Sequence, residues 1–75
     1  MNKQDRKEVE EIINILTDVQ SRIESLGEAE QEKFDNLSEG LQQAERGQKM
    51  EEDASTISDI ASDLNGIIEA LQELS

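Results

Sequence analysis

Residues 50–74 read MEEDASTISDIASDLNGIIEALQEL. Apolar side chains recur through this stretch in alternating steps of four and three residues, which is the spacing of the a and d positions in a coiled-coil repeat. The pattern therefore predicts one long amphipathic helix over about 48–74. The residues at its a and d positions are Met50, Ala54, Ile57, Ala61, Leu64, Ile68 and Leu71.

Three further apolar residues widen the stripe of this helix. Ile60, Ile67 and Leu74 occupy the g position of the same repeat. An a/d/g face is wider than one antiparallel neighbour can cover, and it suits a helix that contacts two or more others. An Ile or Leu left in water forgoes about 1.5–3 kcal/mol relative to burial. We therefore expect these residues to take part in self-association.

A second amphipathic helix is predicted near the N-terminus, over about 4–26. Its apolar residues are spaced by alternating steps of three and four, and Ile13 and Ile15 widen the stripe. Gly27 follows the last of them and is expected to end the helix as a C′ glycine. The residues of the stripe are Val9, Ile12, Leu16, Val19, Ile23 and Leu26.

The middle segment, over about 28–46, is predicted to be an irregular helical connector. Asn36 and Ser38 are both favourable N-cap residues, so the segment is expected to break between two short helices near Leu37. Gly47 is expected to separate the connector from the last helix. Phe34, the only aromatic residue, is interpreted as core, with an interface anchor as the alternative.

These elements predict an all-α protein of one domain over residues 1–75. Two long amphipathic helices joined by the shorter segment would form an antiparallel hairpin or a three-helix unit, assembled into an oligomeric helical bundle. A monomeric bundle with the middle segment as its third wall is the alternative. The residues expected in the core or the self-association interface are Val9, Ile12, Leu16, Val19, Ile23, Phe34, Leu37, Leu41, Ile57, Ile60, Leu64, Ile67, Ile68, Leu71 and Leu74.

The charge of the chain limits its partners. Nineteen acidic residues against seven basic ones give a formal charge of -12. Phosphate backbones and anionic membrane surfaces repel such a chain, so we expect no direct binding to nucleic acid or membranes. A protein with a basic surface is the expected partner. The alternative interpretation is that the acidity serves solubility alone. The candidate partner-binding residues are Glu28, Glu30, Glu32, Asp35, Glu39, Glu51, Glu52 and Asp53.

Residue types that carry chemistry are scarce. The chain contains neither His nor Cys, and its four glycines form no phosphate-binding loop. We therefore expect no enzymatic activity, no cofactor and no metal site. The charged N-terminal segment lacks the apolar region of a signal peptide, and no apolar run is long enough to span a bilayer. A cytoplasmic location is expected.

The segment from Glu30 to Gln42 reads EQEKFDNLSEGLQ. It resembles small uncharacterised acidic helical proteins of bacteriophages and prophages, which carry an aromatic residue followed by Asp-Asn-Leu-Pro-Glu-Gly-Leu-Gln. Phe34 fills the aromatic position, and Ser38 stands where proline is expected. The resemblance covers about a quarter of the chain. It implies a phage context and a helix start near Ser38, and it implies no particular activity.

Three functional hypotheses follow. The first is a phage-type accessory protein that acts in the cytoplasm of the host cell, where it binds a host or defence protein and inhibits it. DNA mimicry is a sharper version of this hypothesis. The second is a structural or assembly coiled-coil protein without inhibitory activity. The third is an oligomer that sequesters a small ligand, which would require Arg22, Lys33 or Arg46 to gather in one pocket.

Overall fold

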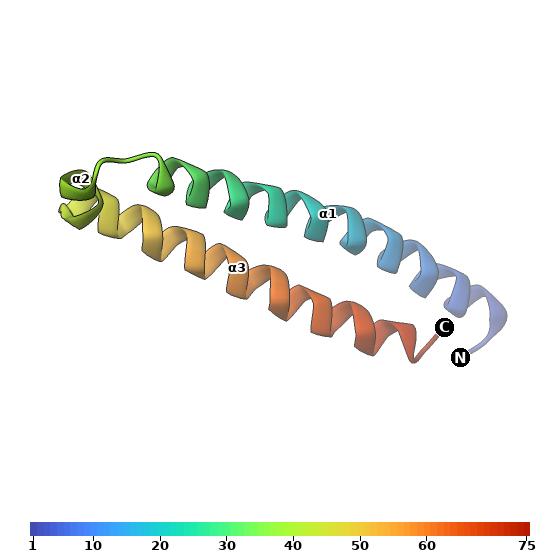
Figure 1. The fold of residues 1–75 in the computed structure, drawn as a ribbon. Coiled ribbons are helices and arrows are strands. Elements are labelled where there is room, and N and C mark those ends of the chain that lie inside the picture. Colours follow the sequence, from blue (N-terminus) through green and yellow to red (C-terminus); the bar gives the residue numbers. More distant parts are fainter.

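The protein is an antiparallel helical hairpin. A computed structural model describes all residues, 1–75, and contains α1 (Lys3–Asp35), α2 (Glu39–Gln43) and α3 (Glu45–Gln72). The two long helices lie side by side, and both termini lie at the same end (Figure 1). The predicted all-α class is confirmed, in the hairpin form. The opposite end is formed by residues 36–44, which include α2 and are called the elbow below.

The first helix is longer than predicted, because Gly27 does not end it. The helix continues through Gly27 to Asp35, and no glycine has a positive φ. A Cβ atom at Gly27 would lie 3.0 Å from Cγ2 of Ile57, so the glycine allows α1 to approach α3 closely. The prediction of a helix end at Leu26 was therefore wrong. A glycine that permits helix–helix contact and a glycine that caps a helix look the same in sequence.

Gly47 likewise lies inside a helix and does not precede it. Since α3 begins at Glu45, Gly47 belongs to its first turn, where it is buried. A Cβ atom there would overlap the carbonyl oxygen of Leu41 and lie 2.7 Å from that of Gln42. The break occurs earlier, at Ala44, whose extended backbone separates α2 from α3. Gly47 thus provides the room that lets α2 fold against α3.

The predicted break near Leu37 is confirmed, but the helix before it is the end of α1 and not a separate short helix. Ser38 is the N-cap of α2, and the Leu41 N–H donates to its Oγ at 3.4 Å. Two glutamine side chains hold the elbow: Gln42 Nε2 donates to the Phe34 carbonyl at 3.1 Å, and Gln48 Nε2 donates to the Gln42 carbonyl at 3.0 Å. The Phe34 carbonyl also accepts from the Leu37 N–H at 3.0 Å. The Gln42 carbonyl lies at the end of α2, where a helix leaves its carbonyl groups without an intrahelical partner.

The middle segment does not form a third wall. Residues 28–35 belong to α1, and α2 has only five residues, which lie across the end of the hairpin (Figure 1). The monomeric three-helix alternative therefore does not describe this fold. The helix continues instead of giving way to a connector because extending a formed helix needs no new nucleation, and Phe34 is half-buried on its inward side.

The core is a single thin layer between α1 and α3. The α3 residues that face α1 are those of the predicted a/d stripe, and each is buried or half-buried. Only Val9, Ala54, Ala61 and Ile68 among the apolar residues are buried by more than nine-tenths. The inward positions of α1 are Val9, Ile13, Leu16, Gln20, Ile23, Gly27, Glu30 and Phe34. The radius of gyration is 17.1 Å, against about 11 Å for a compact domain of this length.

Candidate protein-binding surface

The register between the two long helices is fixed by three small or polar residues. Gly27 lies opposite Ile57. Gln20 Nε2 donates to the carbonyl of Ala61 at 3.3 Å and to Oδ1 of Asn65 at 3.2 Å. Because the helices are antiparallel, each step of seven residues toward the start of α1 matches a step of seven toward the end of α3. These contacts therefore define which residues lie at the same level along the whole hairpin.

One side of the hairpin is a polar groove. It has a volume of about 590 Å³ and runs between the helices at the e and b positions of both. Its walls contain carboxylates and no Lys or Arg, so it offers no countercharge to an anionic ligand. The polar residues that line it are Gln20, Glu24, Glu28, Gln31, Ser58, Ser62 and Asn65.

The other side is apolar. In an antiparallel pair, the g positions of the two helices border one side and the e positions border the other. The g positions here hold Ile12, Val19 and Leu26 on α1 and Ile60, Ile67 and Leu74 on α3, and none of these lines the groove. We call these six residues the outer apolar face. Val19 is half-buried, and the others are exposed by between 37% (Ile12) and 59% (Leu26).

The six residues form three layers along the hairpin. Leu26 comes one residue before Gly27 and Ile60 three residues after Ile57, so they lie within two residues, or about 3 Å, of the same level. By the same register, Val19 lies level with Ile67, and Ile12 with Leu74. Successive layers are seven residues apart, or about 10 Å along each helix. Ile15, 62% exposed, extends this side at a c position.

The predicted α1 stripe is split between the core and this face. Val9, Leu16 and Ile23 point inward as predicted, whereas the prediction that Ile12 and Leu26 belong to the same seam was wrong. We call the rows of a and d residues through which α1 and α3 face each other the inner seam. On α1 it passes instead through Ile13, Gln20, Gly27 and Glu30. Three of these are not apolar, and therefore a search for apolar spacing missed them.

Of the other predicted core residues, most are where they were expected. Phe34 and Leu37 are half-buried beside the elbow. Leu41 is 56% exposed, although it borders a small cavity of about 220 Å³ together with Met50. Its helix, α2, is too short to turn a complete apolar face inward. The remaining predicted α3 residues of the inner seam, all half-buried or buried, are Ile57, Leu64, Ile68 and Leu71.

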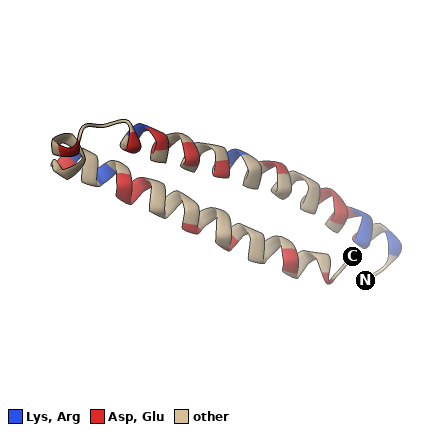
Figure 2. Ribbon diagram, viewed as in Figure 1, with Lys and Arg blue, Asp and Glu red and all other residues tan.

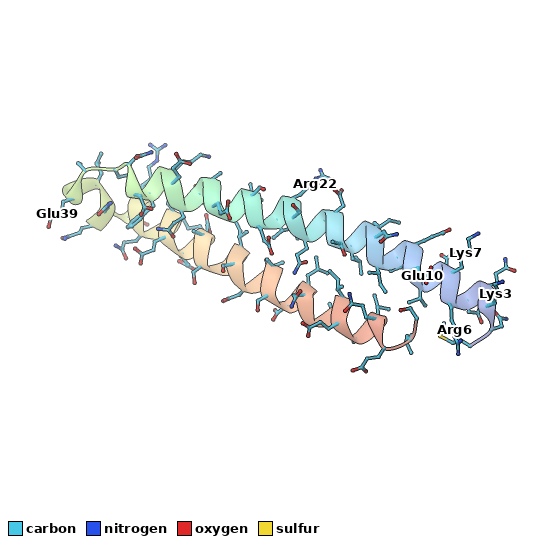
Figure 3. The ribbon with its side chains drawn as sticks, turned by 45° about the vertical axis from the view of Figure 1, so that its right-hand side comes forward. Lys3, Arg6, Lys7, Glu10, Arg22 and Glu39 are labelled. Atoms are coloured by element: carbon cyan, nitrogen blue, oxygen red, sulfur yellow. The ribbon has the colours of Figure 1, made fainter.

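The predicted acidic surface gathers near the elbow. Glu39 lies in the elbow itself, the other residues flank it on α1 and α3, and acidic positions are frequent at that end in Figure 2. Glu30 and Asp53 are half-buried, and the other six are exposed. At the opposite end, Lys3, Arg6 and Lys7 occupy the first turns of α1, far from Glu39 (Figure 3).

One ion pair forms on this surface. Lys49 Nζ lies 2.9 Å from Oδ1 of Asp53, four residues along α3. The hydrogen bond to Asp53, and then the negative charges of Asp53 and Glu52, raise the pKa of Lys49 above its ordinary value. The side chain of Lys49 is 67% exposed and that of Asp53 40%, so solvent screens the pair and its contribution to stability is small.

No three carboxylates lie close enough together to hold a metal ion. Neither long helix contains an apolar stretch that would span a bilayer. Comparison with protein-family models, curated proteins and solved structures finds no match to this chain. The resemblance of residues 30–42 to phage and prophage proteins therefore stays an expectation.

Proposed function

We propose that this chain is a helical protein-binding module that acts through its outer apolar face. The observation that supports this function is the uncovered two-helix surface of six aliphatic side chains in three layers. Burying a large aliphatic side chain is worth about 1.5–3 kcal/mol, so a helical partner on this face would gain several such increments. The function is the same whether the module serves as an accessory inhibitor or as an assembly component.

The acidic residues around the elbow support a second mode of binding. Glu51 and Glu52 on α3 and Glu28 and Glu32 on α1 are exposed and lie on the same end of the hairpin. A partner with a basic surface would be steered toward this end at low ionic strength. Such steering falls with added salt, whereas binding by the apolar face does not.

A photo-crosslinking amino acid separates the two sides of the hairpin. It is placed at Ile67 on the outer apolar face, and in a matched control at Ser62 on the polar groove, since both positions are exposed on α3. Cells that produce each variant are irradiated, and the crosslinked products are identified by mass. The proposal expects protein adducts from position 67 and few from position 62. Equal adducts from both, or none from position 67, would overturn it.

A further inference from the structure

We propose that a second copy of this chain covers the outer apolar face. The two hairpins lie side by side with their elbows at the same end, related by a two-fold axis parallel to their length, and form a four-helix bundle. This inference rests on the proposed function, because it names the partner of the same surface. Three observations support it: the area left exposed, the charge of this side, and the match of opposite charges along it.

The hairpin exposes enough surface for a stable dimer. Its accessible surface is 5680 Å² for a mass of 8.4 kDa. A compact monomer of that mass exposes roughly 4,600 Å², so the excess is roughly 1,100 Å². A standard interface takes about 800 Å² from each partner. One copy docked along the apolar side through an interface of that size would therefore remove most of the excess.

The side that would be buried is electrically neutral, although the chain is not. The side is made of the g and c positions of both long helices. Its basic residues are Arg22, Lys33, Arg46 and Lys49. Its acidic residues are Asp5, Glu8, Asp53 and Asp63. The whole net charge of -12 thus lies on the rest of the chain, and two copies meet through this side without bringing like-charged surfaces together.

A two-fold axis along the hairpin fixes which residues meet, because it leaves every residue at its own level. The register of one hairpin therefore also holds between copies: α1 of one lies against α3 of the other. Arg22 comes five residues before Gly27 and Asp63 six after Ile57, so Arg22 of each copy faces Asp63 of the other. In the same way Ile15 faces Ala70.

A second charged pair lies nearer the elbow. Lys33 comes six residues after Gly27 and Asp53 four before Ile57, so they lie within two residues, or about 3 Å, of the same level. Asp53 is also the partner of Lys49 in its own chain. Within the hairpin, Arg22, Lys33 and Asp63 form no ion pair. Arg22 points away from α3 of its own chain (Figure 3), which leaves its guanidinium free to pair with another copy.

In the alternative, end-for-end arrangement the two hairpins point in opposite directions, so that each elbow lies beside the termini of the other copy. This arrangement pairs the charged and apolar residues less well. To superimpose the three apolar layers, it must place Val19 against its own counterpart. Arg22, three residues after Val19, would then face Ile15 of the other copy, four residues before it. Arg22 would then lose its ion pair with Asp63, and Ile15 would not be buried against an apolar side chain. The side-by-side arrangement avoids this mismatch.

Charge exchange tests the pairing. Arg22→Glu should weaken the dimer roughly tenfold, because each of two symmetric pairs becomes repulsive. Arg22→Glu combined with Asp63→Arg should restore the affinity to about that of the native chain, since it rebuilds both pairs. The double variant keeps the net charge of -12, and both positions are exposed in the hairpin. Sedimentation equilibrium measures the dissociation constant of the dimer for the native chain and for each variant. Failure of the double variant to recover would overturn the pairing.

Single cysteines test the orientation, because the chain has none of its own. Val19→Cys mixed with Ile67→Cys should give a mixed disulfide dimer on oxidation, and Val19→Cys alone should give little. A dominant Val19–Val19 disulfide would overturn the side-by-side arrangement. A native chain that stays monomeric at every concentration would overturn self-docking, while adducts of another protein at position 67 would leave the proposed function standing.

Discussion

Glycines in this hairpin have different roles at the scale of the single residue. At Gly47 a Cβ atom would strike the backbone of the elbow, at Gly27 it would press on Ile57, and at Gly66 it would meet nothing within 4 Å. All three lie in helices with ordinary backbone angles. The sequence predicted a helix break at Gly27 and at Gly47 and placed Gly66 inside a helix. Only the packing of neighbouring atoms shows what each glycine contributes.

Gly66→Ala should stabilise the hairpin by about 1 kcal/mol. Position 66 is exposed inside α3, and alanine restricts the unfolded chain and favours the helix without touching a neighbour. Urea denaturation followed by circular dichroism measures the change. A midpoint that does not rise would show that α3 is not helical at this position under the conditions used.

Gly47→Ala, which carries the same gain in helix propensity, should instead destabilise the protein by about 1–3 kcal/mol. The added methyl group overlaps the carbonyl oxygens of Leu41 and Gln42, so the elbow must move. Gly66→Ala is its matched control in the same denaturation experiment. If both variants were stabilised equally, α2 would not pack on the first turn of α3 as described.

At the scale of the helix, the two long elements differed in how well sequence predicted them. All seven predicted a/d residues of α3 face inward, because that helix has an apolar residue at every a and d position from Met50 to Leu71. On α1 the inner seam contains Gln20, Gly27 and Glu30, so the apolar spacing selected the d and g positions instead. Half of the selected residues belong to the core and half to the outer apolar face.

The candidate surface was only partly predictable for the same reason. Ile60, Ile67 and Leu74 stood out as g positions beside a complete seam, and the structure leaves all three exposed. Their counterparts on α1 were assigned to the seam itself, since nothing in one sequence marks Gln20 as an inward residue. Its hydrogen bonds to α3 supply that information.

Gln20→Leu tests the position of this residue. If Gln20 occupies an a position of the inner seam, leucine there should stabilise the hairpin by about 1 kcal/mol, because apolar burial replaces two long hydrogen bonds at a partly buried site. Thermal unfolding gives the comparison, with Thr17→Leu on the outward e position as control. Destabilisation by Gln20→Leu would show that the polar contacts contribute more than the packing.

At the scale of the whole molecule, the hairpin is 58 Å long and one side-chain layer thick. Four apolar residues buried by more than nine-tenths make a small core for 75 residues. Chains of this size commonly need a disulfide, a metal or a partner to reach ordinary stability. With no cysteine in the chain, the outer apolar face is the surface through which a partner would supply the missing burial.

The solution mass is the measurement that tests this account most directly. Light scattering after size exclusion, over a tenfold dilution, should give two chains for the native protein. Ile60→Asp combined with Ile67→Asp should give one chain that keeps much of its helicity, because both positions lie outside the inner seam. A native mass of one chain at every concentration, or a mass left unchanged by the two aspartates, would contradict self-association through the outer apolar face.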